Sequence, residues 1–169
     1  MDPEVPRSSR GGGTIPPTGK PLHHTLRVPT SVDLPVLTEI CLRSKAHWGY
    51  DAAFMAACVP VFTFSSDDLG QGHWRICDAP QGMAHVTLQG ASATLDKLFI
   101  VPAAMGQGLG AQLFRWACAT AKSGGAERLT ITADPQALAF YTHLGAVQIG
   151  HTPSEVLAGR LLPVVQVTL

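Results

Sequence analysis

The chain has 169 residues, enough for one domain with a single hydrophobic core and too few for two. Hydrophobic residues make up 46% of it and charged residues 14%, a balance that fits a globular protein. Lysine plus arginine equal aspartate plus glutamate at 12 each, so no net charge attracts nucleic acid or anionic lipid. Any polyanion that binds this chain must therefore be held by the local geometry of a site.

Cysteine and histidine spacing gives no sign of a metal site. The four cysteines are scattered, without a CxxC pair or a histidine at zinc-finger spacing: Cys41, Cys58, Cys77 and Cys118. Free thiols are typical of a reducing cytoplasm, and no apolar run reaches the length of a membrane span. We therefore expect a cytoplasmic protein with no metal and no membrane contact.

Residues 1–21 differ in composition from the rest. They contain three successive glycines at 11–13 and the pair Pro16-Pro17, and they offer almost nothing to bury. We interpret them as a disordered tail or an expression remnant. One folded domain is expected over residues 22–169.

The first half of this domain predicts a strand, two helices and three strands joined by turns. Leu34, Leu37 and Ile40 recur at helical spacing, and Asp51 is placed as the N-cap of the second helix. From residue 73 the pattern changes to short strand-like runs separated by turn residues. The predicted ranges are 26–28, 33–45, a helix from 51, 73–77, 83–88 and 94–101.

The second half predicts a helix, a strand, a helix and two strands, over 108–122, 128–132, from 135, 147–150 and 164–169. Asp134 is placed as the N-cap of the later helix and Pro135 at its first turn. The apolar stripe of the earlier helix is expected to comprise Leu109, Leu113, Trp116 and Ala117. The order β-α-α-β-β-β-α-β-α-β-β describes an α/β fold with a mixed sheet, in which antiparallel hairpins lead into one βαβ unit.

The most informative segment is the glycine-rich turn between the strand ending near residue 101 and the next helix. It reads Gly106-Gln-Gly108-Leu-Gly110. The first amides of a helix are unpaired and carry positive partial charge, and glycines let a phosphate approach them closely. The segment therefore predicts a pyrophosphate site. The alternative is that the glycines only form a tight turn and allow close helix–sheet packing.

A dinucleotide site is a competing interpretation of the same turn. Residues 106–111 satisfy GxGxxA, and Glu127 lies about where an acidic ribose ligand is expected. However, Glu127 precedes the next strand instead of ending it, and some eighty residues come before the motif. The chain that follows is also short for the second half of such a fold. This interpretation is the weaker one.

The turn resembles the cofactor motif of the GCN5-related N-acetyltransferases, Gln/Arg-x-x-Gly-x-Gly/Ala, here starting at Met105. A second segment, from Asp134 through Phe140-Tyr141 to Gly145-Ala146, is similar to that family's Asn-x-x-Ala…Phe-Tyr-x-x-x-Gly-Phe helix. Met105, Asp134 and Ala146 depart from the residues common in the family. Together with the element order, the resemblance covers residues 22–169.

The resemblance implies an acyl-CoA N-acyltransferase fold and an acetyl-CoA-dependent N-acetyltransferase that acts on a small-molecule or peptide amine. A catalytically silent acyl-CoA sensor of the same fold is the alternative, and a homodimer is compatible with the family. The implied cofactor contacts are Leu98, Phe99, Ile100, Met105, Gly106, Gln107, Gly108, Leu109, Gly110, Ala111, Asp134, Ala137 and Phe140.

Two side chains are candidates for proton transfer. By resemblance, the Tyr141 hydroxyl lies near the thioester sulfur; otherwise this residue is a core aromatic. The strand glutamate that some family members use as a base falls at Thr94, which cannot accept the proton. Asp96 lies two residues further on the same strand face and is the substitute candidate, although a solvated surface carboxylate is an equal alternative.

The resemblance implies that the loop between the first two predicted helices contributes to the acceptor site. It holds two aromatic residues, a histidine and two cations within eight residues. The residues expected to contact the acceptor are Lys45, His47, Trp48 and Tyr50. A positive side chain here, Arg43 or Lys45, would favour an acceptor with a carboxylate or phosphate. A capped turn whose aromatic residues pack on the core is the alternative.

Overall fold

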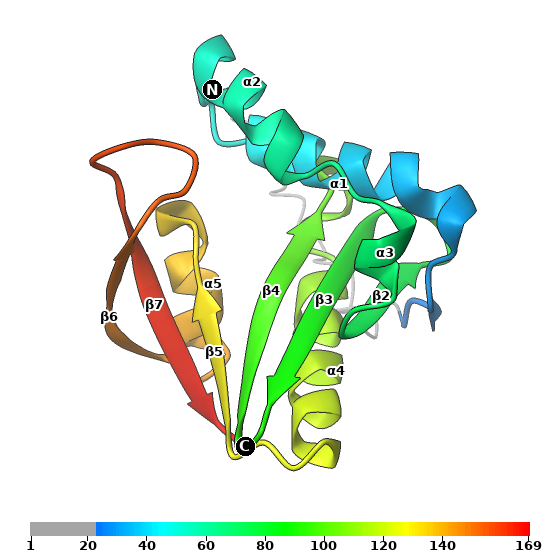
Figure 1. Cartoon of the computed structure of the whole chain (residues 1–169), viewed down its shortest axis with the longest axis vertical. Coiled ribbons are helices and arrows are strands. Elements are labelled where there is room, and N and C mark those ends of the chain that lie inside the picture. The colour runs from blue at the N-terminus through cyan, green and yellow to red at the C-terminus, as the bar shows by residue number, and fades with distance from the viewer. Residues whose placement is uncertain (1–22) are drawn as a thin grey trace, which may run out of the picture.

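A computed structural model describes residues 23–169 of the chain (Figure 1), so the prediction for residues 1–21 lies outside the described residues. Seven strands form one sheet in the order β1-β2-β3-β4-β5-β7-β6. Their bounds are Leu26–Arg27 (β1), His73–Cys77 (β2), Gly82–Gln89 (β3), Ser92–Ile100 (β4), Arg128–Thr132 (β5), Val147–Pro153 (β6) and Leu161–Thr168 (β7). β4 and β5 are parallel and the other neighbours are antiparallel, which confirms the predicted mixed sheet.

Within residues 23–169, five α-helices accompany this sheet. They are α1 (Leu34–Ala46), α2 (Ala52–Val61), α3 (Ser66–Leu69), α4 (Leu109–Ser123) and α5 (Leu138–His143). Short 3-10 segments precede three of them, at Ser31–Asp33, Pro102–Ala104 and Pro135–Ala137. The order of strands and helices is the predicted one except for α3, which the sequence pattern missed. This helix has four exposed or half-buried residues and therefore no apolar stripe.

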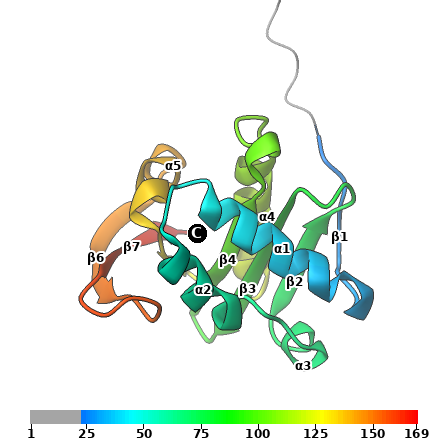
Figure 2. The same ribbon diagram turned by 90° about the horizontal axis from the view of Figure 1, so that it is seen from above.

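Helices cover both faces of the central strands. Residues 82–86 of β3 are all buried, although alternate side chains of a strand point to opposite faces. On one face, the Met83 sulfur lies 3.9 Å from that of Cys41 in α1. On the other face, a Cβ on Gly82 would lie 2.8 Å from the Leu109 side chain of α4, so glycine is needed for this close approach. The view from above shows α1 and α4 crossing the sheet on either side of these strands (Figure 2).

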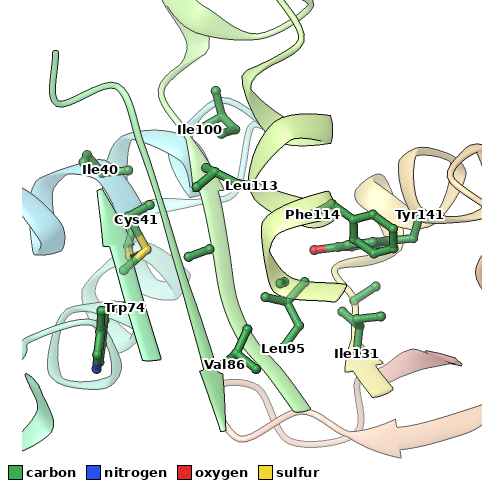
Figure 3. Close-up of a cluster of buried hydrophobic side chains, with 14 of the residues drawn as sticks. Ile40, Cys41, Trp74, Val86, Leu95, Ile100, Leu113, Phe114, Ile131 and Tyr141 are labelled. Atoms are coloured by element: carbon green, nitrogen blue, oxygen red, sulfur yellow. Dashed lines mark hydrogen bonds between the residues drawn. The ribbon is translucent and has the colours of Figure 1, made fainter. Parts of the chain in front are cut away.

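The core joins β3, β4 and β5 to α1 and α4 (Figure 3). Leu109, Leu113 and Ala117 of α4 are fully buried, as predicted. Trp116, the fourth residue of the predicted apolar stripe, is partly buried and packs against the core, and Phe114 is buried as well. Trp116 is half-buried, with the Arg75 guanidinium 5.2 Å from its ring centre. No helix within residues 23–169 is both long and apolar enough to cross a membrane.

The last two strands are longer than predicted. Pro153 and Pro163 interrupt the strand pattern in the sequence, since proline cannot donate to a sheet ladder. In the structure, Pro163 still serves as an acceptor, because its carbonyl takes a hydrogen bond from the Ala133 amide at 2.9 Å. The hairpin therefore extends through both prolines, and its loop at residues 154–160 lies close to the carboxyl end of β5.

Candidate active site

The two parallel strands of the sheet separate from each other. β4 pairs with β5 only at Ser92, Ala93 and Thr94, although β4 continues to Ile100. β5 is paired along its whole length with β7 on its other side. The gap opens toward α1 and α2 in Figure 1. Beyond Thr94, therefore, the β4 edge that faces β5 has no strand partner among the described residues, and its backbone groups are available to a ligand.

A cavity of about 870 Å³ occupies this opening and reaches the start of α4. Eleven of the thirteen expected cofactor residues line it: Leu98, Phe99, Ile100, Met105, Gly106, Gly108, Gly110, Ala111, Asp134, Ala137 and Phe140. The other two do not. The Leu109 side chain is fully buried in the core, and the Gln107 side chain is exposed and donates to the Ala103 carbonyl at 2.8 Å.

The turn before α4 depends on glycine at two positions. Gly106 has φ +75° and Gly108, the N-cap of α4, has φ +88°, a region that residues with a Cβ rarely adopt. A Cβ on Gly106 would meet nothing within 4 Å, so the space beside this turn is open. The first amides of α4 thus border the cavity without a side chain in front of them, which suits a phosphate.

Gly110 has a different role from the other two glycines. A Cβ at this position would lie 3.1 Å from the Phe140 ring of α5. Phe140 in turn packs edge-on against Tyr141, with ring centres 5.0 Å apart. Gly110 therefore allows α5 to approach α4, which is the close packing that the alternative interpretation of the glycines expects.

Tyr141 lies in the wall of the cavity with 5% of its surface exposed. Its hydroxyl points from α5 toward α4 and β4 (Figure 3). Burial, together with the negative charge of Asp134, raises the pKa of Tyr141 well above its ordinary value. At neutral pH the hydroxyl consequently keeps its proton and is able to donate it.

Asp96 occupies an irregular position of β4. His85 pairs with Lys97 and the next residue, Val86, pairs with Leu95, so Asp96 has no partner in β3. Its carboxylate accepts a hydrogen bond from Thr87 at 2.8 Å and lies 3.6 Å from Nδ1 of His85. The side chain is 30% exposed and lines the cavity. The structure thus brings Asp96 and Tyr141 to one cavity, from opposite sides of the strand opening.

His85 lies beside Asp96 in a largely buried position. Its ring is stacked on Trp74, with ring centres 4.0 Å apart, and its Nε2 lies 2.9 Å from the Gln71 carbonyl oxygen. Because a carbonyl only accepts, Nε2 carries the hydrogen and Nδ1 is the nitrogen that faces Asp96. Burial lowers the pKa of His85 below its ordinary value, and this effect exceeds the opposite effects of the Gln71 carbonyl and of the Asp96 and Asp68 charges.

This lowered pKa predicts a pH-dependent contribution of His85 to stability. Below about pH 6.5 the unfolded chain protonates its histidine before the folded protein does, so the contribution is present above that pH and is lost as the pH falls toward the folded pKa. We expect the Tm of the wild type to fall more steeply than that of His85→Gln on acidification from about pH 7 to about pH 5. Parallel Tm curves would contradict the assignment of a neutral, buried His85.

Asp134 connects four parts of the chain. Its carboxylate caps the segment before α5 by accepting from the Gln136 amide at 2.9 Å, as predicted for an N-cap. It also accepts from Lys45 at 2.7 Å and from the Tyr50 hydroxyl at 2.8 Å. Arg160, from the β6–β7 loop, lies 3.5 Å from the same carboxylate and also donates to the Tyr50 hydroxyl. Burial alone would raise the pKa of Asp134, but the hydrogen bonds from Lys45, Gln136 and Tyr50 and the charge of Lys45 lower it overall.

The four residues expected to contact the acceptor divide into two pairs. Lys45 and Trp48 line the cavity. His47 is exposed and packs edge-on against Trp48, with ring centres 4.8 Å apart, so it does not reach the cavity wall. Tyr50 also lies behind the wall, because its hydroxyl is taken by Asp134 and Arg160.

Sequence reasoning missed Arg160 and His85. Arg160 is one of only two residues of formal charge after position 143, the other being Glu155, and this isolation within an apolar stretch was the available signal. His85 gave none, because a histidine within a strand is ordinarily a core or surface residue. Both acquire their roles only through contacts between distant parts of the chain.

Comparison with known proteins was made for sequence and for structure. Residues 75–156 match the sequence profile of a family described as Acetyltransferase (GNAT) domain. Comparison with the sequences of curated proteins finds no match. Many solved structures have this fold, and three of them are described below.

The first is a GCN5-related N-acetyltransferase from Rhodopseudomonas palustris, which is 22% identical, with 90% of this chain and 99% of that chain covered and a TM-score of 0.76. The second is the PaiA N-acetyltransferase of Thermoplasma acidophilum in complex with coenzyme A, at 14% identity, 88% and 100% coverage and a TM-score of 0.73. The third is YncA of Salmonella typhimurium with its cofactor acetyl-CoA, at 17% identity, 87% and 94% coverage and a TM-score of 0.61. At these identities the likeness concerns the fold.

Proposed function

We propose that this chain, whose residues 75–156 match a family described as Acetyltransferase (GNAT) domain, transfers the acetyl group of acetyl-CoA directly to a primary amine of a small molecule or peptide. The observation that carries the proposal is the separation of β4 from β5 beyond Thr94, with one cavity joining the free strand edge to the glycine turn. A long, flexible ligand with a phosphate at one end fits a site of this form.

The residues of the cavity suit coenzyme A at both ends. The turn at Gly106 and Gly108 would hold the pyrophosphate through the first amides of α4. The backbone of Leu98 to Ile100 would pair with the amides of the pantetheine arm along the free edge of β4. Met105, where the family commonly has Gln or Arg, provides no charged contact, so the backbone carries the binding of the phosphates.

The chemistry requires a base, a donor toward the carbonyl oxygen and an acid. Acetyl-CoA, as the second substrate, supplies an acetyl group activated as a thioester. Asp96 would take the proton that the amine loses as its nitrogen bonds to the carbonyl carbon. A backbone N–H on the free edge of β4 would stabilise the negative charge on the oxygen. When the carbon–sulfur bond breaks, Tyr141 would give its proton to the departing thiolate and recover one from solvent.

A dinucleotide fits this site less well than coenzyme A does. Glu127, the candidate ribose ligand, lies just before β5, where its amide donates to the Ala91 carbonyl and its carbonyl accepts from the Leu169 amide. Its side chain makes no hydrogen bond or ion pair within residues 23–169. The opening of the sheet lies at the opposite end of that strand. An acidic side chain at this position is therefore remote from a ligand bound at Gly108.

Thermal unfolding with separate additions of acetyl-CoA, CoA and NADP tests which ligand binds. A ligand at about 100 times its Kd adds about 2.7 kcal/mol, which raises the Tm of a domain of this size by several degrees. We expect a shift with acetyl-CoA and with CoA and none with NADP. A shift with NADP alone would overturn the proposal and favour the dinucleotide interpretation.

Tyr141→Phe tests the proposed acid. The substitution removes the hydroxyl and keeps the ring that packs against Phe114 and Phe140. We expect kcat to fall about 10-fold, below the usual range of about 100- to 10,000-fold for acid catalysis, because a thiolate is already a fair leaving group. The affinity for CoA and the Tm should change little. Turnover equal to that of the wild type would show that Tyr141 has only a packing role.

A further inference from the structure

Four side chains form a charged cluster at the acceptor side of the cavity, and we call Lys45, Tyr50, Asp134 and Arg160 the Asp134 cluster. It joins the end of α1, the following loop, the end of β5 and the β6–β7 loop. Lys45 lies 2.7 Å from the Asp134 carboxylate and Arg160 3.5 Å from it. Lys45, Asp134 and Arg160 all line the cavity.

The cluster has more positive than negative charge. It contains two cations and one carboxylate, and the side chains of Lys45, Arg160 and Asp134 are only 13%, 16% and 9% exposed. Tyr50 adds no charge, because burial and its hydrogen bond with Asp134 raise the pKa of its hydroxyl to about 12. The sum is one unbalanced positive charge in a largely buried site, which is costly unless an anion joins it.

No other group in the described part of the chain balances this charge. Glu155 also lines the cavity, but it is exposed and makes no ion pair within residues 23–169. Its charge is screened by water and contributes little to a buried cluster. The remaining charged residues of the cavity wall are Lys97 and Asp96. Their charges are opposite, so together they add no net charge to the wall.

Both cations keep donors for a ligand. Lys45 has three ammonium hydrogens and uses one on Asp134. Arg160 makes its contacts with Tyr50 and Asp134 through Nη2 alone, which leaves Nε and Nη1 free of partners among the described side chains. The Arg160 guanidinium lies over the rings of Tyr50 and Phe54, at 4.9 and 5.1 Å from their centres, so it is held in place before a ligand arrives.

The anion that would balance the Asp134 cluster is expected to belong to the acceptor and not to coenzyme A. The phosphates of the coenzyme would lie at the glycine turn, whereas the charge of Asp134 acts on Tyr141, at the end of the cavity where sulfur is expected. The pantetheine arm and the thioester carry no charge. An anion near the reacting end must therefore come from the molecule that provides the amine.

We infer that the acceptor is a primary amine that also carries a carboxylate, bound by Lys45 and Arg160. This inference rests on the proposed acetyl transfer. A carboxylate matches the single unbalanced charge, whereas a phosphate monoester would bring close to two negative charges and leave one unbalanced. Planar carboxylate geometry also suits the free edge of the Arg160 guanidinium. Arg43, the other cation considered from the sequence, is exposed and pairs with Glu39, so it has no part in the site.

Matched pairs of acceptors test this inference on the wild-type protein. Glycine, β-alanine and 4-aminobutanoate are each compared with the corresponding primary amide, which has the same shape without the charge. We expect kcat/KM to be about 10- to 100-fold higher for the acid in at least one pair, the range for a hydrogen bond to a charged group. The amine of the amide loses its proton more readily, so without the subsite the amide would be the better acceptor.

Substitutions then identify the groups responsible. Arg160→Met and Lys45→Met should each lower the ratio of acid to amide about 10-fold, because either change makes the cluster neutral. Arg43→Met removes an exposed cation of α1 and should leave the ratio unchanged. The Tm and the CoA-induced Tm shift of each variant show whether it folds. If a variant does not fold, the comparison of acids with amides on the wild-type protein still tests the carboxylate subsite.

The outcomes separate the inference from the function on which it rests. Amides accepted as well as acids, or better, would overturn the carboxylate subsite and leave acetyl transfer standing. An acid-to-amide ratio that stays at its wild-type value in both methionine variants would also overturn it. No acetylation of any amine, with CoA still bound, would overturn the proposed function, and the acceptor subsite with it.

Discussion

Replacing Gly108 with valine is expected to weaken CoA binding about 100-fold or more. The residue is the N-cap of α4 with φ +88°, where a β-branched side chain is strained by about 1–3 kcal/mol. The side chain would also stand in front of the first amides of the helix. Each lost charge-assisted hydrogen bond to a phosphate adds about 1.5–3 kcal/mol. Titration calorimetry with CoA measures the effect directly.

Gly90→Val is the matched control for this substitution. Gly90 has φ +59° in the turn between β3 and β4, and a Cβ there would meet nothing within 4 Å. Backbone strain should lower the Tm of both variants, but only Gly108→Val should lose CoA. If Gly108→Val binds CoA as the wild type does, the turn is structural and the phosphate site lies elsewhere.

Replacing Asp96 with asparagine is expected to lower kcat about 100-fold or more, the usual range when a general base is removed. Asparagine has the same shape and still accepts a hydrogen bond from Thr87, so the strand irregularity around it should persist. The affinity for CoA should not change, because the side chain is not expected to contact the coenzyme. Steady-state kinetics with a saturating acceptor amine provides the measurement.

Asp67→Asn is the control for the loss of a negative charge. Asp67 is exposed on α3, and its side chain makes no hydrogen bond or ion pair within residues 23–169. This variant should turn over like the wild type. Wild-type kcat in Asp96→Asn would instead assign proton removal to water, or indicate that the amine arrives already neutral.

Local signals in the sequence were sufficient for most of the fold. The change from helical to strand spacing near residue 73 and the cap at Asp134 each depend on a few neighbouring residues, and the structure confirms them. The glycine turn was likewise recognisable, because positive φ at Gly106 and Gly108 restricts the residue type at those positions. The full lengths of β6 and β7 were not predicted, because proline at 153 and 163 interrupts the strand pattern of this hairpin in the sequence.

The acceptor side of the site could be predicted only in part. Lys45 and Trp48 were found because cations and aromatic residues are dense in one loop. Arg160 reaches the same carboxylate from a loop more than a hundred residues later, and no local pattern relates the two positions. The position of His85 beside Asp96 similarly depends on an irregular strand register that spacing alone does not reveal. Contacts of this kind are set by tertiary packing.

The central claim is tested most directly by incubating the purified protein with acetyl-CoA and a panel of primary amines. Released thiol is followed with a disulfide reagent, and the amine is analysed by mass spectrometry. We predict amine-dependent release of CoA that matches, mole for mole, an amine product heavier by one acetyl group. Tight binding of acetyl-CoA with no amine-dependent release would contradict the claim, and would identify the protein as an acyl-CoA sensor with the fold of an enzyme.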